Sequence, residues 1–555
     1  MEEIALDAAL PRFDPQAVWS QLVGGPAEAS FLAAIGRAIV SRRWFGAKTR
    51  TIQSLEILDA LPLSIVARLM LLQLEFANGP AEIYQVPLTL ATGDRASWLL
   101  SEQIASLWAR IRVGDGPDPV VLVDALNDAA VQRELLYALE TAAPIQGIAG
   151  ELVGWRTSQF VALRGATDVD LPPQLVGAEQ SNSSIVYGDR LILKVFRRVE
   201  MGINPDVEIC TRLTDRGFER VPPLAGGLEY CSAGREPWTL AMAQGFVPNQ
   251  GDAWQNALRR LKTFVESMLT DPQALPGAVR LPVEGLSTTS ESPLPSGVAR
   301  AFPDFAADIE RLGTRTAQMH LELAAGGEDP AFQPELFSED DRRAWAARAR
   351  ELTRETFELL REQGPRLAVA ARKDAANLLP LEPVVHERFD RLAEYPAEVF
   401  KIRGHGDYHL GQVLVAGDDF YVIDFEGEPA RPLSERRQKQ LALRDVAGMI
   451  RSFHYAGCST ANELLVSAVP HDAQLIEQWT GAWYFWMSVA FLSAYRRAAH
   501  GAPFLPSASH DFEQLFGACL LEKAIYELRY ELNNRPDWVY LPLRALHEIL
   551  GNRNI

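Results

Sequence analysis

The segment 404–428, GHGDYHLGQVLVAGDDFYVIDFEGE, constrains the chain most, because it sets polar side chains around a predicted β-hairpin. The runs 413–415 and 420–425 are rich in β-forming residues, and the turn residues AGDD separate them. Such a hairpin carries Asp424 back beside Gln412 and leaves Asp407 on the loop before it. The alternative is a polar hairpin whose aspartates only serve the turn. The joint spacing of the three residues favours a site.

The residue types at these positions indicate phosphoryl transfer. Four residues separate Asp407 from Gln412, which is typical of a catalytic-loop aspartate followed by an amide that approaches magnesium. Mg²⁺ prefers oxygen ligands and is usually held by one or two carboxylates together with substrate phosphates. We therefore predict Asp407 as the catalytic residue, and Gln412 with Asp424 as the Mg²⁺ ligands.

The overall composition excludes several other classes of function. The 555 residues carry a formal net charge of −18, which argues against nucleic acid or an anionic membrane as a partner. The four cysteines show no spacing typical of zinc ligands or of a disulfide framework, which fits a reducing cytoplasm. The acidic N-terminus does not resemble a secretory signal, and the longest apolar stretch, 484–495, is too short to cross a bilayer. We expect a soluble, cytoplasmic protein.

The pattern of apolar residues predicts an α+β chain in three parts. Residues 1–105 form a cap, in which 27–40 is helical and 65–76 and 82–90 are strands. Residues 106–247 form a strand-rich small lobe. Residues 248–555 form a mainly helical large lobe.

A second hairpin in the small lobe presents a lysine. The runs 183–187 and 191–196 flank Gly188-Asp189, a strong turn signal, and Lys194 lies on the second strand. The polar loop before this hairpin could offer hydroxyl and backbone N–H groups to a phosphate, through Ser181, Asn182 and Ser183. The loop contains no glycine and is not a Walker motif.

The helix after the hairpin supplies a predicted partner for this lysine. Asn204 reads as its N-cap, Pro205 as a first-turn proline and Asp206 as a first-turn acid, so a helix that carries Glu208 begins here. A strand lysine oriented by a helix glutamate is the kinase arrangement for binding the α and β phosphates, although an isolated pair is more often an exposed one. The apolar segment 238–247 is the predicted hinge, where Met242 and Gln244 would lie beside an adenine.

Helices dominate the predicted large lobe. They span 304–323, 338–363, 366–378 and 440–455 and continue from 472, after a predicted long loop at 271–303. Asp445 either braces the catalytic loop near His405 or lies solvated on a helix surface. The tryptophans at 479, 483 and 486 share one helical face, which is more often core than a sugar platform.

Several of these motifs resemble those of the maltokinases, a family in the aminoglycoside-phosphotransferase-like group of eukaryotic-like kinases. The resemblance covers nearly the whole chain. The motifs that carry it are RWFGAK, GAEQSNSS, LILKVFRR, NPDVE, HGDYHLGQVL, VIDFEGEP and RDVAGMIRSFHYA. It implies a bilobal, protein-kinase-like fold. It also implies transfer of the ATP γ-phosphate to the anomeric hydroxyl of maltose, which gives maltose 1-phosphate for α-glucan synthesis.

The resemblance also implies residue roles. Lys194 binds phosphates with Glu208 orienting it, and Asp407 positions or deprotonates the sugar hydroxyl. The implied maltose contacts are Glu426, Glu428, Arg431, Trp486 and Tyr495. Some relatives are fused to trehalose synthase, so a complex with such an enzyme is an expected partnership. The segment 271–303 is longer than the family pattern implies, and the chain shows no glycosidase portion.

Two other functions stay open at this level. A kinase for glucosamine or another small sugar would carry the same phosphate machinery. A nucleotide-binding pseudokinase that regulates a trehalose-converting partner would show degraded catalytic positions, yet Lys194, Asp407, Gln412 and Asp424 are all present.

Overall fold

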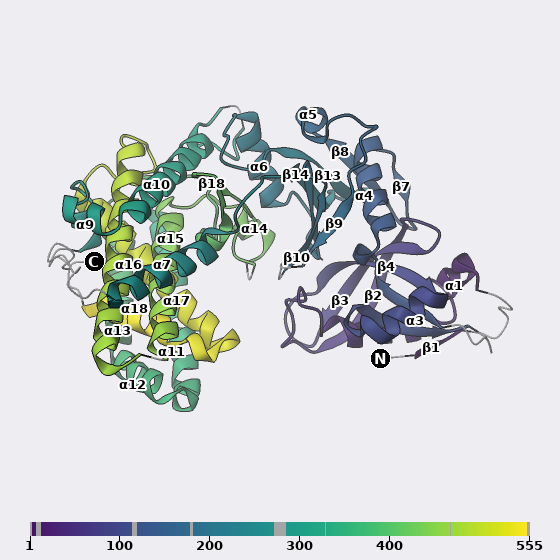
Figure 1. Ribbon diagram of the computed structural model, residues 1–555, viewed down its shortest axis with the longest axis horizontal. Coiled ribbons are helices and arrows are strands. Elements are labelled where there is room, and N and C mark those ends of the chain that lie inside the picture. The colour runs from purple at the N-terminus through teal and green to yellow at the C-terminus, as the bar shows by residue number, and fades with distance from the viewer. Residues whose placement is uncertain are drawn as a thin grey trace. The chain divides into compact units, whose positions relative to one another are not determined.

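The computed structural model describes residues 3–6, 13–113, 119–177, 181–270, 285–327, 329–429, 431–466 and 468–551. The chain forms two compact units, Met1–Thr211 with Pro222–Pro248, and Arg212–Val221 with Asn249–Ile555. Figure 1 labels their elements. The second boundary lies one residue from the predicted start of the large lobe.

The first unit begins with a mostly antiparallel sheet in the order β1-β5-β6-β4-β3-β2, to which β12 adds by pairing with β4. Its strands are β1 (Glu3–Ala5), β2 (Ile52–Pro62), β3 (Ala67–Phe76), β4 (Glu82–Thr92), β5 (Leu107–Arg112), β6 (Val120–Asp124) and β12 (Arg198–Val199). Its helices are α1 (Pro15–Leu22), α2 (Glu28–Ile39) and α3 (Gly93–Glu102). The predicted end of the cap at 105 is wrong, because β5 and β6 complete this sheet through the pairing of β6 with β4.

The buried faces explain the local structure of this cap. Helix α2 buries Phe31, Ile35 and Ile39, which recur at a spacing of four. The RWFGAK segment is a packed turn, in which the buried Phe45 lies 5.2 Å from the Tyr84 ring, centroid to centroid.

The second sheet of the first unit is antiparallel and follows the order β7-β8-β13-β14-β11-β10-β9. Its strands are β7 (Ile145–Gln146), β8 (Glu151–Arg156), β9 (Pro173–Val176), β10 (Asn182–Tyr187), β11 (Leu191–Phe196), β13 (Leu224–Cys231) and β14 (Trp238–Gly245). The helices here are α4 (Ala129–Thr141), α5 (Phe160–Arg164) and α6 (Pro205–Asp215). The predicted hairpin is confirmed as β10–β11, with Ser184 opposite Lys194.

Asp59 ties the two sheets of this unit together. Its fully buried carboxylate accepts hydrogen bonds from the backbone N–H groups of Ile148 and Ala149 and from the Tyr230 hydroxyl. Side chains of both sheets also share one apolar cluster, which includes Leu61 and Ile185. A buried carboxylate with three donors is well satisfied, so this joint stabilises the unit.

The second unit is mainly helical. Its helices are α7 (Ala253–Thr270), α8 (Leu286–Thr289), α9 (Ser296–Ala301), α10 (Pro303–Ala324), α11 (Glu339–Gln363), α12 (Val369–Leu378), α13 (Glu382–Glu394), α14 (Leu433–Arg436), α15 (Leu443–Leu465), α16 (Pro470–Ala498), α17 (Ser509–Asn534) and α18 (Tyr540–Gly551). Two short antiparallel strand pairs accompany them, β15 (Glu335–Leu336) with β16 (Phe400–Lys401) and β17 (Val413–Ala416) with β18 (Asp419–Val422). Helices α10, α16, α15 and α17 pack on one another in that succession (Figure 1).

Several predictions for this unit can be compared with the structure. Residues 271–284 of the predicted long loop lie outside the described residues, and the rest of that segment contains α8, α9 and the start of α10. The tryptophan stripe is core, since Trp479, Trp483 and Trp486 are each at most 4% exposed. Among the described residues, no helix combines the length and apolar character that crossing a membrane requires.

Candidate active site

The hairpin β17–β18 brings the predicted metal ligands together. Val413 pairs with Val422, and a turn at Gly417, where φ is 63°, reverses the chain. Gln412 directly precedes the hairpin and Asp424 follows it, and the Gln412 Nε2 donates to Asp424 Oδ2 over 2.7 Å. Asp424 has a φ of 68°, a left-handed conformation that only one other described non-glycine residue adopts. Such strain is typical of positions that must aim a functional side chain.

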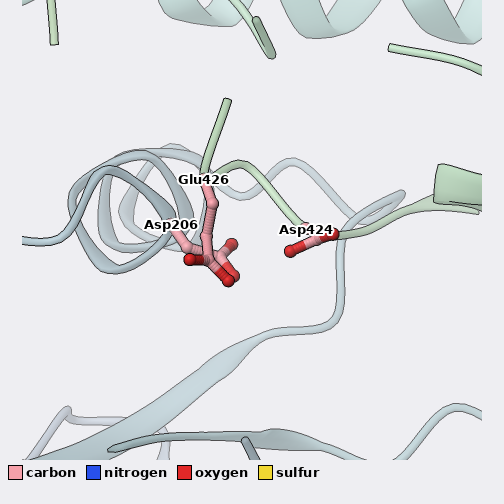
Figure 2. Close-up of side chains that lie close together, drawn as sticks. All are labelled: Asp206, Asp424 and Glu426. Atoms are coloured by element: carbon pink, nitrogen blue, oxygen red, sulfur yellow. The ribbon is translucent and has the colours of Figure 1, made fainter. Parts of the chain in front are cut away.

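A third oxygen-bearing side chain follows on the same segment. Figure 2 shows Asp424 and Glu426 on the stretch of chain after β18. The backbone carbonyl of Glu426 accepts a hydrogen bond from Arg436 Nη1 over 2.9 Å, which holds this stretch to α14. Two carboxylates and an amide offer hard oxygen donors without sulfur or imidazole, so the residues present fit Mg²⁺.

Asp407 lies on the loop before the hairpin, next to cationic groups. The Lys523 Nζ donates to Asp407 Oδ1 over 3.3 Å, and His409 Nε2 lies 3.9 Å from Oδ2. Burial raises the pKa of Asp407, but the positive charge of Lys523 and the two neighbouring histidines outweigh burial and lower that pKa below its usual value. Asp407 is therefore ionised at neutral pH.

Asp445 braces the loop that carries Asp407. It is 4% exposed, and its two oxygens accept the backbone N–H groups of His405 over 2.7 Å and of Gly406 over 2.9 Å. The His320 Nε2 lies 3.1 Å from the same carboxylate. A side chain at Gly404 would meet Asp445, since a Cβ there would lie 2.7 Å from its Oδ2. Asp445 is thus the predicted brace, and the surface alternative is wrong.

His405 connects this loop to the segment that carries the metal ligands. Its ring Nε2 lies 2.9 Å from the Ile423 carbonyl oxygen, one residue before Asp424. The ring also packs against Tyr408 and Phe425, at 5.2 and 4.8 Å between centroids. The buried His405 therefore sets the position of the catalytic loop relative to the hairpin.

Lys523 of helix α17 was not predicted from the sequence, although it links two expected site residues. Its Nζ contacts Glu428 Oε1 at 3.4 Å as well as Asp407, and it lies 4.8 Å from the centre of the Tyr526 ring. Glu428 also accepts a hydrogen bond from Arg431 Nε. The two carboxylates raise the pKa of Lys523 although burial alone would lower it. The only available signal was a lysine in the otherwise mostly apolar run CLLEKAIY.

The structure contradicts the two aromatic contacts expected for maltose. Tyr495 is fully buried, and its hydroxyl lies 2.9 Å from His320 Nδ1. Trp486 is 4% exposed within the same helix, α16. Both rings belong to the core of the helical unit, where a sugar could not stack on them.

Lys194 contacts an acid on helix α6 in the first unit. Its Nζ donates to Asp206 Oδ2 over 2.8 Å, and Asp206 is 1% exposed. Figure 2 shows Asp206 on this helix. Asn204 accepts the Asp206 backbone N–H with its side chain, which confirms the predicted N-cap. Asp206 thus forms a contact that we expected of Glu208, and the role of Glu208 stays a prediction.

The predicted phosphate loop lies partly outside the described residues, which resume at 181. Ser181 is exposed at the start of the hairpin, and Asn182 is buried in β10. The Ser183 hydroxyl accepts a hydrogen bond from Arg197 Nε over 2.9 Å. Ser181, Asn182 and Ser183 stay predictions as phosphate contacts.

The predicted adenine contacts at Met242 and Gln244 need correction. Both residues lie inside β14, which is paired with β11 on one side and β13 on the other at these positions. The Gln244 amide donates to the Pro222 carbonyl oxygen over 3.2 Å. Because the sheet uses the backbone groups of β14, an adenine would have to find backbone partners after Gly245.

Comparison with known proteins identifies the cap and the fold. Residues 39–128 match the model of the maltokinase N-terminal cap domain. The glucosamine kinase of Streptacidiphilus jiangxiensis is 28% identical over 458 residues, covering 80% of this chain and 83% of the relative. The glucosamine kinase of Mycolicibacterium smegmatis (strain ATCC 700084 / mc(2)155) is 25% identical over 397 residues, covering 70% and 83%.

Solved structures of glucosamine kinase share the fold. Crystal form B has a TM-score of 0.58 at 22% identity, covering 94% of this chain and 99% of that chain. A complex with glucosamine, ADP and inorganic phosphate has a TM-score of 0.56 at 20% identity, with the same coverage. The chain therefore shares the fold of these kinase structures over nearly its whole length. The predicted α+β, kinase-like fold is confirmed.

Proposed function

We propose that this protein is a sugar kinase that transfers the γ-phosphoryl group of ATP to the anomeric hydroxyl of maltose. The observation that carries the proposal is the Asp407 carboxylate, which contacts Lys523 on a loop that Asp445 braces and that His405 connects to the segment of the predicted metal ligands. The maltokinase cap supports maltose as the acceptor, and the relatives support a sugar kinase that uses ATP.

Each of these side chains has a separate role in the proposed reaction. Phosphoryl transfer passes through a loose transition state, so it needs alignment and charge stabilisation more than a strong base. A carboxylate with a lowered pKa suits this task, because Asp407 can accept a hydrogen bond from the attacking hydroxyl and take its proton late. Lys194 would contact the α and β phosphates. Asp424 and Gln412 would hold Mg²⁺, which neutralises phosphate charge when bound.

The charges around Asp407 favour a neutral acceptor. Glucosamine carries an ammonium group at neutral pH, whereas maltose carries none. The cationic Lys523 contacts both Asp407 and Glu428, and Arg431 contacts Glu428 as well. A positively charged substrate that approached these carboxylates would be repelled by Lys523 and Arg431, and this repulsion would lower its affinity.

Glucosamine is the second candidate, because two curated relatives and the similar solved structures are glucosamine kinases. A complex with a trehalose synthase, which would supply maltose, stays a prediction. The bound metal also stays a proposal, since it is inferred from the oxygen ligands alone.

An ADP-release assay tests the acceptor. The purified protein is given ATP, Mg²⁺ and one of maltose, glucose, trehalose, glucosamine or an aminoglycoside. We expect maltose to give the highest kcat/KM, and Asp407→Asn to serve as the blank for ATP hydrolysis by contaminants. A response to glucosamine that exceeds the response to maltose would replace the first candidate with the second. No response to any acceptor would refute the sugar-kinase proposal.

A further inference from the structure

Helix α10 carries two polar residues, Thr316 and His320, one helical turn apart on its buried face. Both side chains are fully buried, among neighbours on the same face that are mostly apolar. A buried polar side chain costs stability unless it is hydrogen-bonded, so each of the two needs partners. Thr316 finds a partner on the catalytic loop 404–409, and His320 finds one on the carboxylate that braces this loop.

His320 holds the brace Asp445. Its Nε2 lies 3.1 Å from Asp445 Oδ2, and because a carboxylate oxygen only accepts, this ring nitrogen carries the hydrogen. The other ring nitrogen, Nδ1, lies 2.9 Å from the Tyr495 hydroxyl, which can donate to it. A partner at the second nitrogen fixes the tautomer and the orientation of a histidine ring. Asp445 in turn accepts the N–H groups of His405 and Gly406, the two residues before the catalytic aspartate.

Thr316 holds the residue on the other side of the catalytic aspartate. Its hydroxyl donates to the Leu312 carbonyl of the same helix over 2.8 Å. The Tyr408 hydroxyl lies 2.9 Å from the same threonine oxygen, and since the threonine hydrogen is already used, Tyr408 is the donor. Tyr408 is 2% exposed, so loss of the Thr316 oxygen would leave a buried donor without this acceptor. Asp407 therefore lies between two anchored neighbours.

The same helix also contacts the hairpin β17–β18. Arg315 bonds to Asp419 through two pairs of atoms, Nε to Oδ1 over 3.0 Å and Nη2 to Oδ2 over 2.6 Å. Arg311 Nη1 donates to the Asp418 carbonyl oxygen. A bidentate arginine–carboxylate pair restricts geometry as well as adding energy. One helix thus holds both the catalytic loop and the hairpin that joins the predicted metal ligands.

We propose that Thr316 and His320 are positioning residues of the phosphoryl transfer, which align Asp407 with the bound substrates from the surface of α10. The proposal rests on the role of Asp407 in the proposed function. Both residues act through other side chains, Tyr408 and Asp445, and not on the reacting atoms. Phosphoryl transfer depends on alignment, and a displacement of about 1 Å can cost about a hundredfold in rate. Loss of either bond should therefore lower kcat more than it changes the KM for ATP.

Steady-state kinetics of full-length variants test the Thr316 anchor, with ATP, Mg²⁺ and the acceptor that gives the highest kcat/KM in the ADP-release assay. Thr316→Val keeps the shape and removes the hydroxyl, so we expect kcat to fall by about tenfold or more while the KM for ATP stays within about twofold. Thr316→Ser keeps the oxygen and should recover most of the loss. A kcat of Thr316→Val that equals the kcat of the control below would overturn the proposal.

Thr314→Val is the matched control on the same helix. The Thr314 hydroxyl also donates to a carbonyl of α10, that of Glu310 over 2.9 Å. Within the part of the chain that the structure describes, it makes no bond to the catalytic loop. We expect Thr314→Val to keep the kcat of the wild type.

Tyr495→Phe and His320→Gln test the second anchor. Tyr495→Phe removes the partner of Nδ1 and frees the ring, so kcat should fall by about threefold to tenfold. His320→Gln keeps an N–H for Asp445 that does not depend on the tyrosine, so adding Tyr495→Phe to it should change kcat by less than about twofold. An equally large loss from Tyr495→Phe in both backgrounds would show that Tyr495 does not act through His320, which would overturn the second anchor.

Hydrogen exchange without substrates separates this inference from the proposed function. We expect the amides of 404–409 to exchange faster in Thr316→Val and in Tyr495→Phe than in the wild type, and at the wild-type rate in Thr314→Val. Wild-type exchange at 404–409 in both anchor variants would overturn the proposal. If no acceptor reacts, the proposed function fails, and exchange at 404–409 alone decides whether α10 positions the loop.

Discussion

Lys523 decides the electrostatics of the candidate active site at the scale of single residues. It lies against two carboxylates, Asp407 and Glu428, and its charge holds the pKa of Asp407 low in a buried setting. Without that charge, burial would raise the pKa of Asp407. A lysine that is distant in sequence therefore acts together with His405 and His409 to lower the pKa of the Asp407 carboxyl.

The pH dependence of turnover should reveal this role. In the wild-type protein the low pKa of Asp407 places the acid limb of the profile below the usual value of 3.8. Lys523→Met removes the charge, so we expect the acid limb to move to higher pH and kcat to fall by about tenfold or more, equivalent to ~1.4 kcal/mol. Lys523→Arg is the control that keeps the charge. An acid limb at the same pH in Lys523→Met and the wild type would contradict this account.

The hairpin β17–β18 is the element that makes the metal site testable. Asp424 supplies a charge and Gln412 a neutral oxygen, so changes at the two positions should differ. We expect Asp424→Asn to lower activity by about a thousandfold or more, because the ATP phosphates cannot replace that charge. Gln412→Asn keeps the amide one methylene shorter, so a smaller loss and a raised Mg²⁺ requirement are expected.

A magnesium titration at fixed ATP compares the two variants. Asp418→Asn, in the exposed turn of the same hairpin, is the matched control. Wild-type activity in Asp424→Asn, or an unchanged Mg²⁺ requirement in both site variants, would remove the hairpin from the metal site.

Helix α15 stabilises the catalytic loop through Asp445. Burial raises the pKa of Asp445, but the hydrogen bond with His320, the charges of nearby histidines and the Gly406 N–H bring it below the usual 3.8. The unfolded chain then binds more protons than the folded chain in acid, so this contribution is full above about pH 4 and disappears as the pH falls through the folded pKa.

Thermal unfolding at two pH values tests this brace. We expect Asp445→Asn to lower the Tm at about pH 7 by several degrees. The asparagine has one acceptor oxygen in place of two, so one backbone N–H group of the loop stays buried without an acceptor, which costs about 1–3 kcal/mol of the free energy of unfolding. The difference from wild type should shrink below about pH 4. The exposed Asp340→Asn serves as control. A Tm difference that stays constant into acid would show that ionisation of Asp445 does not contribute.

Elements with local signals were predictable from the sequence, and contacts between distant segments were not. The turn at Gly188-Asp189 and the cap at Asn204 fix the β10–β11 hairpin and the start of α6, because both depend on neighbouring residues. The strand β6 joins the first sheet by pairing with β4, which is distant in sequence, and no local sequence pattern predicts that pairing. The predicted boundary at 105 failed for that reason.

In the candidate site too, local contacts were predictable from the sequence and contacts between distant segments were not. Asp424 and Gln412 meet because a hairpin has a fixed register, so their contact followed from spacing. Lys523 reaches Asp407 across 116 positions of sequence, which only the packing of α17 decides. The choice of Asp206 over Glu208 as the acid seen beside Lys194 depends on how the first turn of α6 is oriented, which the sequence does not reveal.

At the scale of the whole molecule, each compact unit carries its own set of residues to which we assign a role. Lys194 and Asp206 belong to the first unit, whereas Asp407, Asp424 and Lys523 belong to the second. Each group is held by contacts within its own unit, such as the 2.8 Å bond between Lys194 and Asp206. A change in one group should therefore leave the ligand of the other group bound.

Separate titrations with a nucleotide and a sugar test this division. We expect Lys194→Ala to weaken ATP binding by about tenfold or more, since a charge-assisted contact to phosphate contributes about 1.5–3 kcal/mol, and to leave maltose affinity unchanged. Asp206→Asn keeps the shape of the acid but removes its charge, so Lys194 should lose its fixed position and ATP affinity should fall less. Arg190→Ala, an exposed cation in the turn of the same hairpin, is the control. If Lys194→Ala lost affinity for maltose while keeping that for ATP, Lys194 would serve the acceptor, and the assignment of the phosphates to the first unit would be wrong.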